Sequence, residues 1–374
     1  MVRKKGGGGL LTSELLPIWE KVERGERLGF ADGLVLLTTQ DLLGLGFMAD
    51  RVRRRLHGDR AYFIVNAHLN HTNVCALNCK FCAFAVKPGH PRAYTLSLED
   101  IAEKLRGLRG RGIREVHITG GINPKLPFSY YTDMLRLVKE ILPDVHVQAF
   151  TAVEIDYMSR LFRMDAVEVL ARLREAGLGS LLGGGAEVFD PEVRLAIAGH
   201  KTDAERWLEI HKVAHGMGIR SNASILYGTI ERPEHVVDHL LRLRELQDET
   251  GGFDAFFGFA FHPENTSLAR ERAFPRETSG MYDLRLLATA RLLLDNFAHI
   301  RVLWMMTGLK LAQVALYFGA DDIDGTVLEE HIIHDAGSEA PQGLTKEELI
   351  ALLREAGRVP VERDTLYRPI AVYA

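Results

Sequence analysis

Residues 73–84 read Asn-Val-Cys-Ala-Leu-Asn-Cys-Lys-Phe-Cys-Ala-Phe and contain all three cysteines of the 374-residue chain. Cys75, Cys79 and Cys82 are separated by three and two residues, so their thiolates can bind three irons of one 4Fe–4S cube. An electron carrier normally supplies four cysteines, and this loop therefore leaves one iron open to a ligand. The odd number and tight spacing argue against structural disulfides and favour a reducing compartment.

Two other roles for the cysteine loop fit its sequence less well. A structural zinc site usually takes four ligands from paired Cys-x2-Cys units, so His71 or His90 would have to complete the set. Inert buried cysteines do not suit a loop that contains Asn73, Asn78 and Lys80. We therefore expect an iron–sulfur cluster.

Apolar runs that suit buried strands alternate with amphipathic helical patterns on the carboxyl side of residue 60. The expected strands are residues 62–70, 115–120, 145–151, 178–182, 220–227, 255–261, 301–304 and a short one near 321–325. Helices are expected near 98–108, 130–141, 166–176, 204–215, 234–246, 282–296 and 309–317. Continuous apolar strands separated by helices indicate parallel strands that are covered on both faces. About eight such units predict an α/β fold of the (β/α)8 TIM-barrel type, and a doubly wound open sheet is the alternative.

Four segments make up the predicted domain organisation. Residues 1–11, basic and then glycine-rich, are interpreted as a flexible tail, and helical spacing of apolar residues predicts an N-terminal helical cap over 12–60. The barrel is expected over 61–330. Residues 331–374 are expected to form a C-terminal extension, with a helix at 344–356 and a tail at 359–367, packed on the barrel.

The composition is that of an ordinary globular protein, with 47% apolar and 26% charged residues. A formal net charge of −4 leaves no basic surplus for a nucleic-acid backbone. No apolar run approaches the roughly 20 residues that a membrane-spanning helix needs. We therefore expect a cytoplasmic protein that binds neither nucleic acid nor membranes.

Phe81 stands directly before the third cysteine, and a Cys-x3-Cys-x-aromatic-Cys loop after the first strand resembles the signature of the radical S-adenosylmethionine (SAM) superfamily. This resemblance implies a 4Fe–4S cluster on Cys75, Cys79 and Cys82, with the amino and carboxylate groups of SAM on the open iron. One electron from the cluster would then cleave SAM to a 5′-deoxyadenosyl radical. The protein would place this radical and exclude water.

Glycine-rich loops after the strands supply the first candidates for binding SAM, because a barrel of this type has its active site at the carboxyl ends of the strands. Gly120 and Gly121 let a ligand approach the backbone. They resemble the superfamily's Gly-Gly motif for the methionine amino group, although Ile122 replaces its customary acidic residue. Glu187, which follows three glycines, could accept hydrogen bonds from the ribose hydroxyls. A plain strand-to-helix turn is the alternative for the Gly-Gly loop.

Two further elements are candidates for binding the cofactor. Arg194 could hold the cofactor carboxylate through a bidentate contact, or it could be an exposed helix arginine. Residues 224–231 resemble the superfamily's element for the adenine, with Ser224 and Leu226 in place of its first glycine and isoleucine.

Seven strings between residues 17 and 367 together resemble the aminofutalosine synthase family of the futalosine route to menaquinone. They are HLNHTNVC (68–75), AFTAVEI (149–155), QDETGGF (247–253), FHPENT (261–266), LDNF (294–297), DGTV (324–327) and ERDTLY (362–367). The resemblance implies that the adenosyl radical adds to the enol ether of 3-[(1-carboxyvinyl)oxy]benzoate. Aryl migration and loss of bicarbonate would then give 6-amino-6-deoxyfutalosine. SAM would be consumed as a co-substrate, and a reducing donor such as flavodoxin or ferredoxin would supply the electron.

The substrate implied by this resemblance carries two carboxylates, so charge-assisted donors should line the barrel mouth. The expected donors are His68, Asn70, His262 and Arg301, with Glu154, Asn222 and Tyr227 as polar inward-facing neighbours. Any one of them could instead be a hydrogen-bonded core residue. As a set at strand ends they are the predicted catalytic residues.

Three alternatives remain for the activity. The nearest are dehypoxanthine futalosine cyclase, which is the sister enzyme of the same pathway, and the deazaflavin-forming radical SAM synthases. From a different class, a non-enzymatic iron–sulfur electron carrier would need no SAM and would usually fill the fourth ligand position itself. The sequence offers no fourth cysteine for that purpose.

Overall fold

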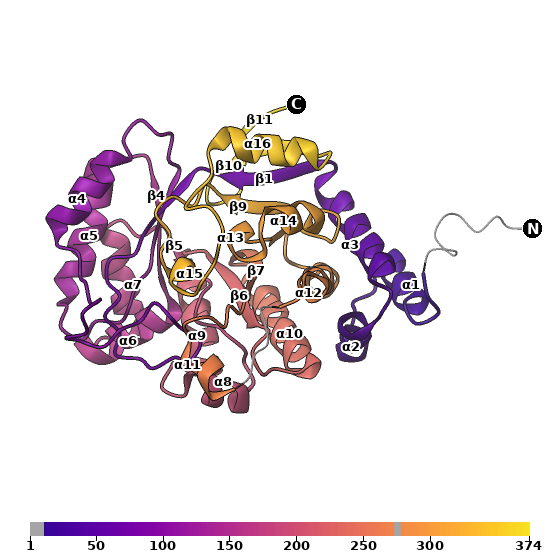
Figure 1. Cartoon of the computed structure of the whole chain (residues 1–374), viewed down its shortest axis with the longest axis horizontal. Coiled ribbons are helices and arrows are strands. Elements are labelled where there is room, and N and C mark those ends of the chain that lie inside the picture. The colour runs from indigo at the N-terminus through magenta and orange to yellow at the C-terminus, as the bar shows by residue number, and fades with distance from the viewer. Residues whose placement is uncertain (1–10, 273–277) are drawn as a thin grey trace, which may run out of the picture.

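Parallel strands organise the structure, a computed structural model that describes residues 11–272 and 278–374. The strands are β1 (Arg60–Ile64), β2 (Asn66–Leu69), β3 (Glu115–Ile118), β4 (His146–Thr151), β5 (Ser180–Leu182), β6 (Ser221–Tyr227), β7 (Phe253–Ala260), β8 (His299–Arg301), β9 (Asp322–Gly325), β10 (Val359–Arg363) and β11 (Pro369–Val372). Over the described residues they form one curved sheet in the order β11-β10-β1-β9-β8-β7-β6-β5-β4-β3-β2 (Figure 1). Residues 1–10 of the predicted tail lie outside the described residues.

The chain from Arg60 to Leu69 forms two strands, where the sequence predicts one. β1 pairs in parallel with β9 on one side and β10 on the other, whereas β2 pairs with β3. After β9 the chain continues beside β2, because the His68 N–H donates to the Leu328 carbonyl at 2.8 Å. The β1–β2 segment therefore joins both ends of the series β3 to β9, and the sheet curls into the predicted (β/α)8-type barrel rather than a doubly wound open sheet.

Sixteen helices in the described residues cover and cap this sheet. They are α1 (Leu16–Arg24), α2 (Phe30–Thr38), α3 (Leu42–His57), α4 (Leu98–Gly107), α5 (Phe128–Ile141), α6 (Ala152–Phe162), α7 (Ala166–Glu175), α8 (Pro191–Ala198), α9 (Ala204–Gly216), α10 (Pro233–Thr250), α11 (Ser267–Glu271), α12 (Gly280–Leu293), α13 (Trp304–Thr307), α14 (Leu309–Ala315), α15 (Ile332–Asp335) and α16 (Lys346–Glu355). Side-chain caps fix where several begin: Ser97, Thr151 and Asp203 accept N–H bonds in the first turns of α4, α6 and α9. Helix α6 follows β4 directly and was not predicted.

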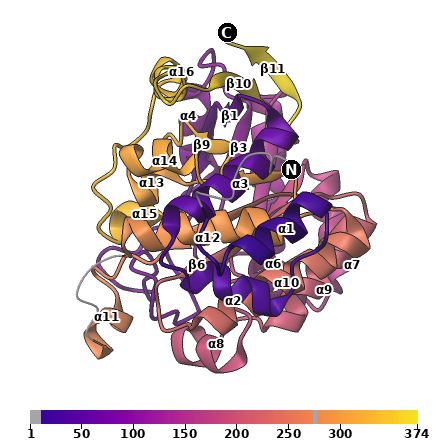
Figure 2. The ribbon, with the colours of Figure 1, turned by 90° about the vertical axis from the view of Figure 1, so that its right-hand side faces the viewer.

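The N-terminal helices pack on the outside of the barrel. Helices α2 and α3 contact α12, and α2 also contacts α10. Figure 2 shows α1, α2 and α3 lying across α12 and α10 on this side of the molecule. The Trp19 side chain from α1 is buried and stacks at an angle on Phe47 of α3, with ring centroids 5.6 Å apart. These helices therefore cover one flank of the barrel and lie away from the carboxyl ends of its strands.

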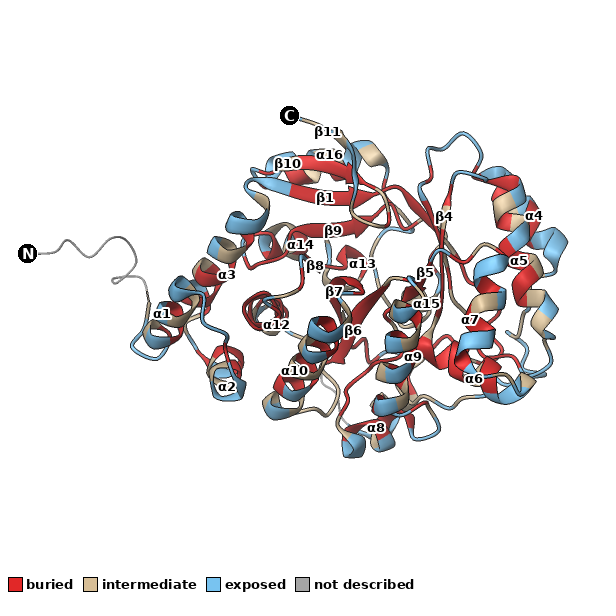
Figure 3. Ribbon diagram, turned by 180° about the vertical axis from the view of Figure 1, so that it is seen from behind, coloured by how far each residue is buried: buried red, intermediate tan, exposed pale blue. Residues whose placement is uncertain are grey.

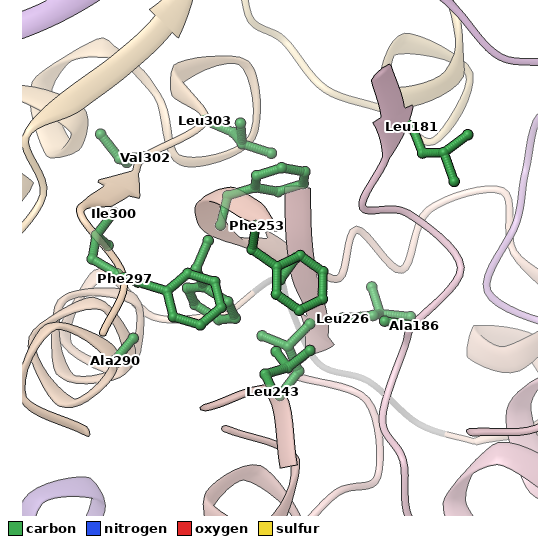
Figure 4. Close-up of a cluster of buried hydrophobic side chains, with 14 of the residues drawn as sticks. Leu181, Ala186, Leu226, Leu243, Phe253, Ala290, Phe297, Ile300, Val302 and Leu303 are labelled. Carbon is green, nitrogen blue, oxygen red and sulfur yellow. The ribbon is translucent and has the colours of Figure 1, made fainter. Parts of the chain in front are cut away.

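The strands form the core, as their continuous apolar sequences imply. Every residue of β6 and all but one of β7 are buried. Figure 3 shows the same pattern, with buried strands at the centre and exposed outer faces on α4 and α5. In the core close-up of Figure 4, Phe253 of β7 packs beside Phe297, with ring centroids 5.6 Å apart, near Leu243 of α10 and Ile300 of β8. Burial on both faces is what a parallel sheet between helices requires.

The C-terminal residues join the sheet, which the sequence did not predict. Residues 359–367, expected as a tail, begin with β10, which pairs with β1 in parallel and with β11 in antiparallel fashion. Strand β10 pairs with β1 on the side where β3 pairs with β2. It therefore completes the sheet where the chain bends between β1 and β2. Strand β8 also ends earlier than predicted, because Trp304 begins α13. Among the described residues, no helix combines the length and apolar character needed to cross a membrane.

Candidate active site

A cavity of about 310 Å³ lies at the carboxyl ends of the strands, where the barrel fold predicts the active site. Its wall includes residues from each strand from β2 to β9 and from the loops that follow them. Apolar groups such as Phe257, Phe259, Leu303 and Met305 make up much of the lining. A largely apolar cavity with a few polar groups is the usual form of a small-molecule site.

All three cysteines line this cavity. Backbone contacts hold their loop in place, because the Cys75 N–H donates to the Val86 carbonyl at 3.0 Å and the Ala76 N–H donates to the Ile122 carbonyl at 2.7 Å. The Lys87 ammonium donates to the carbonyls of Cys75, Ala76 and Leu77 at 3.3, 3.2 and 2.8 Å. The thiols are therefore presented on a fixed backbone.

The donor set fits an iron–sulfur cube better than a zinc ion. Burial raises the pKa of the Cys79 thiol to about 12, and it also raises the pKa of Cys82. Neutral thiols stay protonated until a metal displaces the protons, as cluster binding does. His71 and His90, which a zinc site would need, are not on the cavity wall.

Gly120 and Gly121 line the cavity and pack on the cysteine loop. A Cβ on Gly121 would lie 2.4 Å from the Val74 carbonyl oxygen, and one on Gly120 would lie 2.9 Å from that of Thr72. Any side chain here would push the loop after β3 away from the cysteines. The two glycines therefore allow the loop after β3 to pack closely on the cysteine loop. This structural role does not depend on whether a ligand also binds to their backbone.

Glu154 is a buried carboxylate on the cavity wall. It accepts hydrogen bonds from the Thr151 N–H at 2.7 Å and the Thr151 hydroxyl at 2.9 Å, and so caps α6. Burial raises its pKa to about 7, although Thr151 and the Gly120 backbone act in the opposite direction. The loop after β3 carries Ile122 at the position where the superfamily's Gly-Gly motif customarily has an acidic residue. Glu154 supplies a carboxylate next to that loop.

Glu187 and Lys201 form an ion pair on the cavity wall. Arg194 lies behind them and is absent from the lining. Its guanidinium donates to the carbonyls of Ala186 and Thr202, which are neighbours of the paired residues in the sequence. The structure therefore does not place Arg194 at a cofactor carboxylate, because its donors are used on the backbone.

Two imidazoles stack on the cavity wall. The His68 and His117 rings have centroids 4.4 Å apart and an interplanar angle of 4°, because the two residues are paired across β2 and β3. Burial lowers the pKa of each ring to about 3, so both are neutral at pH 7. The stack offers a flat apolar face and neutral ring nitrogens.

Arg301 is a buried cation on the cavity wall. Its guanidinium donates to Asp324 at 3.2 Å and to the Tyr367 hydroxyl at 3.2 Å, and lies over the Phe257 ring at 5.5 Å from the centroid. Its Nε is buried and has no hydrogen-bond partner among the described residues. Burial raises the pKa of Asp324 to about 6, so the carboxylate that faces Arg301 is itself easily protonated.

Further predicted residues also line the cavity. The His262 Nε2 lies 3.2 Å from the Met306 carbonyl, and the Asn222 amide donates to Gln148 at 3.4 Å. Phe81 and Leu226 contribute apolar surface. The structure thus brings together His68, Glu154, Asn222, His262, Arg301, Phe81, Gly120, Gly121, Glu187, Leu226, Cys75, Cys79 and Cys82.

Three other predicted residues do not line this cavity. The Tyr227 hydroxyl donates to Asp283 of α12 at 2.9 Å, because successive side chains of a strand point to opposite faces and Tyr227 faces the helices. The Ser224 hydroxyl donates to the Gly183 carbonyl at 2.7 Å within the sheet. The Asn70 amide donates to the Thr119 carbonyl at 3.2 Å and lines a separate cavity of about 220 Å³.

Sequence reasoning did not select four titratable residues of the cavity: His117, Lys201, Asp324 and Glu330. His117 had a usable signal, because a histidine in a predicted buried strand is unusual and it pairs with His68. Lys201 and Glu330 lie in connections without periodicity. Asp324 lies in the strand that the sequence predicts least clearly.

Two family models match the chain in succession. Residues 69–243 match the model described as the radical SAM superfamily, and residues 250–373 match the CofH/MqnC C-terminal region. Together with the cysteine-lined cavity, the first match defines a radical SAM enzyme. Such enzymes carry a 4Fe–4S cluster and use SAM, so this protein has the cluster as its cofactor and uses SAM.

Curated relatives narrow this class. The chain is 48% identical to the aminodeoxyfutalosine synthase of Thermus thermophilus over 98% of each chain. It is 36% identical to the cyclic dehypoxanthine futalosine synthase of Streptomyces coelicolor, over 96% of this chain and 90% of that protein. The chain belongs to the aminodeoxyfutalosine synthase family.

A solved structure supports the fold. The FeFe-hydrogenase maturase HydG from Carboxydothermus hydrogenoformans matches with a TM-score of 0.73 and 17% identity, over 95% of this chain and 81% of that one. The barrel is therefore similar to that of this maturase despite little sequence identity.

Proposed function

We propose that the protein joins the 5′-deoxyadenosyl group of SAM to 3-[(1-carboxyvinyl)oxy]benzoate and releases 6-amino-6-deoxyfutalosine and bicarbonate. The observation that carries this proposal is one cavity whose wall contains three cysteines and a buried arginine, Arg301. The cysteines suit the radical source, and the arginine suits an anionic substrate. Family membership supplies the identity of that substrate.

Several residues have roles in binding SAM under this proposal. Cys75, Cys79 and Cys82 would hold the cluster, which together with SAM supplies the 5′-deoxyadenosyl radical. Glu187 offers acceptor oxygens for the ribose hydroxyls, and Glu154 offers them for an ammonium group near Gly120. Leu226 presents apolar surface on the adenine side. Apolar walls exclude water, which protects a radical from side reactions.

Arg301 is the residue that we assign to a substrate carboxylate. Its Nε makes no hydrogen bond among the described residues and lies 3.8 Å from an Asp322 carboxylate oxygen, while Asp324 and Tyr367 accept hydrogen bonds from the rest of the guanidinium. A charge-assisted hydrogen bond from a buried arginine is strong and directional. The neutral His68 and His117 stack supports the aryl ring, and His262 and Asn222 supply further polar contacts on the same wall.

The reaction also needs one electron from outside the chain. We propose that the protein acts in the cytoplasm and that a reducing protein such as flavodoxin or ferredoxin donates this electron.

Product analysis after anaerobic reconstitution tests the proposal. The reduced enzyme, SAM and 3-[(1-carboxyvinyl)oxy]benzoate are incubated together and analysed by liquid chromatography and mass spectrometry. The expected product is a covalent adenosyl adduct that has lost one carboxylate. A cyclised product from dehypoxanthine futalosine, with release of 5′-deoxyadenosine, would identify the sister activity instead. A reducible cluster that never cleaves SAM would identify an electron carrier.

A further inference from the structure

A buried lysine lies beside the cysteine loop, and the proposed reaction gives it no step. Lys201 belongs to the connection between α8 and α9, and its ammonium contacts the Glu187 carboxylate. The two side chains are 12% and 6% exposed. Both line the cavity that holds the cysteines.

Two observations place the Lys201 ammonium close to the cysteines. It lies 5.3 Å from the centroid of the Phe81 ring, and Phe81 is the residue before Cys82. The Lys80 N–H, next to Cys79, donates to the Ile197 carbonyl of α8 at 2.8 Å, and this bond holds the cysteine loop against the helix that precedes Lys201.

The backbone that carries the pair is fixed by Arg194. Its guanidinium donates to the Ala186 carbonyl on one loop and the Thr202 carbonyl on the other. The Thr202 hydroxyl in turn donates to Asp156 at 2.8 Å. Lys201 and Glu187 are therefore two fixed charges of opposite sign beside the thiols.

A fixed positive charge at this place has a definite electrostatic consequence. When an external reductant delivers one electron, the [4Fe–4S]2+ core becomes [4Fe–4S]+, so with three thiolates the net charge goes from −1 to −2 and no bond forms or breaks. In a site with little water, a nearby cation stabilises the more negative state. Net charge and surrounding polar groups are known determinants of cluster potentials.

We propose that Lys201 raises the reduction potential of the cluster and that Glu187 partly offsets this effect. Lys201 is then a positioning residue for the electron transfer that starts the reaction. The inference rests on the cluster that the proposed function requires, but not on the identity of the substrate.

Redox titration of the reconstituted proteins without SAM tests this inference. The EPR signal of the reduced cluster is followed against potential for the wild type, Lys201→Met and Glu187→Gln. Lys201→Met is expected to disfavour reduction at least about tenfold, which is a midpoint about 59 mV more negative for a one-electron couple. Glu187→Gln is expected to shift the midpoint in the positive direction. The double variant should lie closer to the wild type than Lys201→Met does.

Two further variants separate charge from structure. Lys201→Arg keeps the cation and should keep the midpoint near that of the wild type. Lys80→Met removes an ammonium from the cysteine loop itself, but this ammonium pairs with Glu271 at the surface at 2.7 Å and should leave the midpoint unchanged. If Lys201→Met does not load its cluster, Glu187→Gln alone tests the inference. A midpoint shift in the positive direction would support it, and a shift in the negative direction would overturn it.

The inference would be overturned if the midpoints of Lys201→Met and Glu187→Gln shifted in the same direction. It would also be overturned if neither midpoint shifted in proteins with wild-type iron content. Opposite shifts combined with the wrong product would leave the inference standing and overturn only the proposed substrate.

Discussion

Two buried polar clusters lie at opposite ends of the barrel strands and differ in how well their charges are compensated. At the amino ends, Asp321 accepts hydrogen bonds from Arg291, from His299 at 2.6 Å and from the Ile300 N–H at 2.8 Å. Burial raises the pKa of Asp321, but His299 and Arg291 lower it more and hold it well below its usual range. At the carboxyl ends, burial raises the pKa of Glu154 to about 7 and that of Asp324 to about 6.

This difference separates stabilising charges from charges that await a ligand. A carboxylate with a lowered pKa stabilises the fold at pH 7, whereas one with a raised pKa costs stability there. The carboxylates of Glu154 and Asp324 lower stability at pH 7 because they lie on the wall of a space that a ligand would fill. Perturbed carboxylates in a cavity are a recognised sign of a functional site.

The largest expected effect is on stability, at the amino-end cluster. Asp321→Ala leaves Arg291 and His299 without their buried anion, and loss of one partner of a buried pair typically costs about 3–5 kcal/mol. Urea unfolding of the apo-protein, followed by circular dichroism, measures this loss. Asp133→Ala is the matched control, because its pair with Arg136 is exposed and should change stability by no more than about 1 kcal/mol. Equal losses in the two variants would contradict the comparison.

The next effect is on activity, at the carboxyl-end cluster. Arg301→Leu removes the proposed carboxylate ligand, and a buried charged contact of this kind is worth about 2–5 kcal/mol, or roughly 30-fold to 4,000-fold in kcat/KM. Stability should fall less than in Asp321→Ala, because Asp324 can take up a proton when Arg301 is lost. Steady-state product formation and urea unfolding are measured on the same samples. An unchanged kcat/KM would exclude Arg301 from substrate binding.

A smaller effect depends on pH. The pKa of Glu154 rises from an ordinary 4.5 to about 7 in the folded state. Stability is therefore fully retained below pH 4.5 and falls as the pH rises to 7, by roughly 3 kcal/mol if no other group compensates. Glu154→Gln should match the wild type near pH 4.5 and exceed it in unfolding free energy at pH 8. Parallel pH profiles for the two apo-proteins would contradict the raised pKa.

The smallest effect is expected outside both clusters. Tyr227→Phe removes the hydroxyl that donates to Asp283 between β6 and α12. The unfolding free energy should fall by about 1 kcal/mol, the usual net value of one hydrogen bond. Product formation should stay within about twofold of the wild type, because the hydroxyl lies outside the cavity. A loss of activity as large as that of Arg301→Leu would return Tyr227 to the catalytic residues.

Sequence was sufficient where a signal is local. The spacing of Cys75, Cys79 and Cys82 and the apolar runs of the strands are readable within a few residues, and the structure places all three thiols on one cavity wall. The alternation of β6 could also have shown that Tyr227 and Leu226 face opposite ways. The break between β1 and β2 could not be read, because it depends on β10, nearly 300 residues further along the chain.

What the sequence determined by itself is a cysteine loop after the first strand of a parallel barrel, because ligand spacing and hydrophobic pattern are properties of neighbouring residues. The tertiary structure decided which charges meet. Lys201 pairs with Glu187, Arg194 donates to the backbone, and Arg301 pairs with Asp324. These outcomes depend on side chains from different loops sharing a buried volume, and the energy of a buried charge depends on all of its neighbours at once.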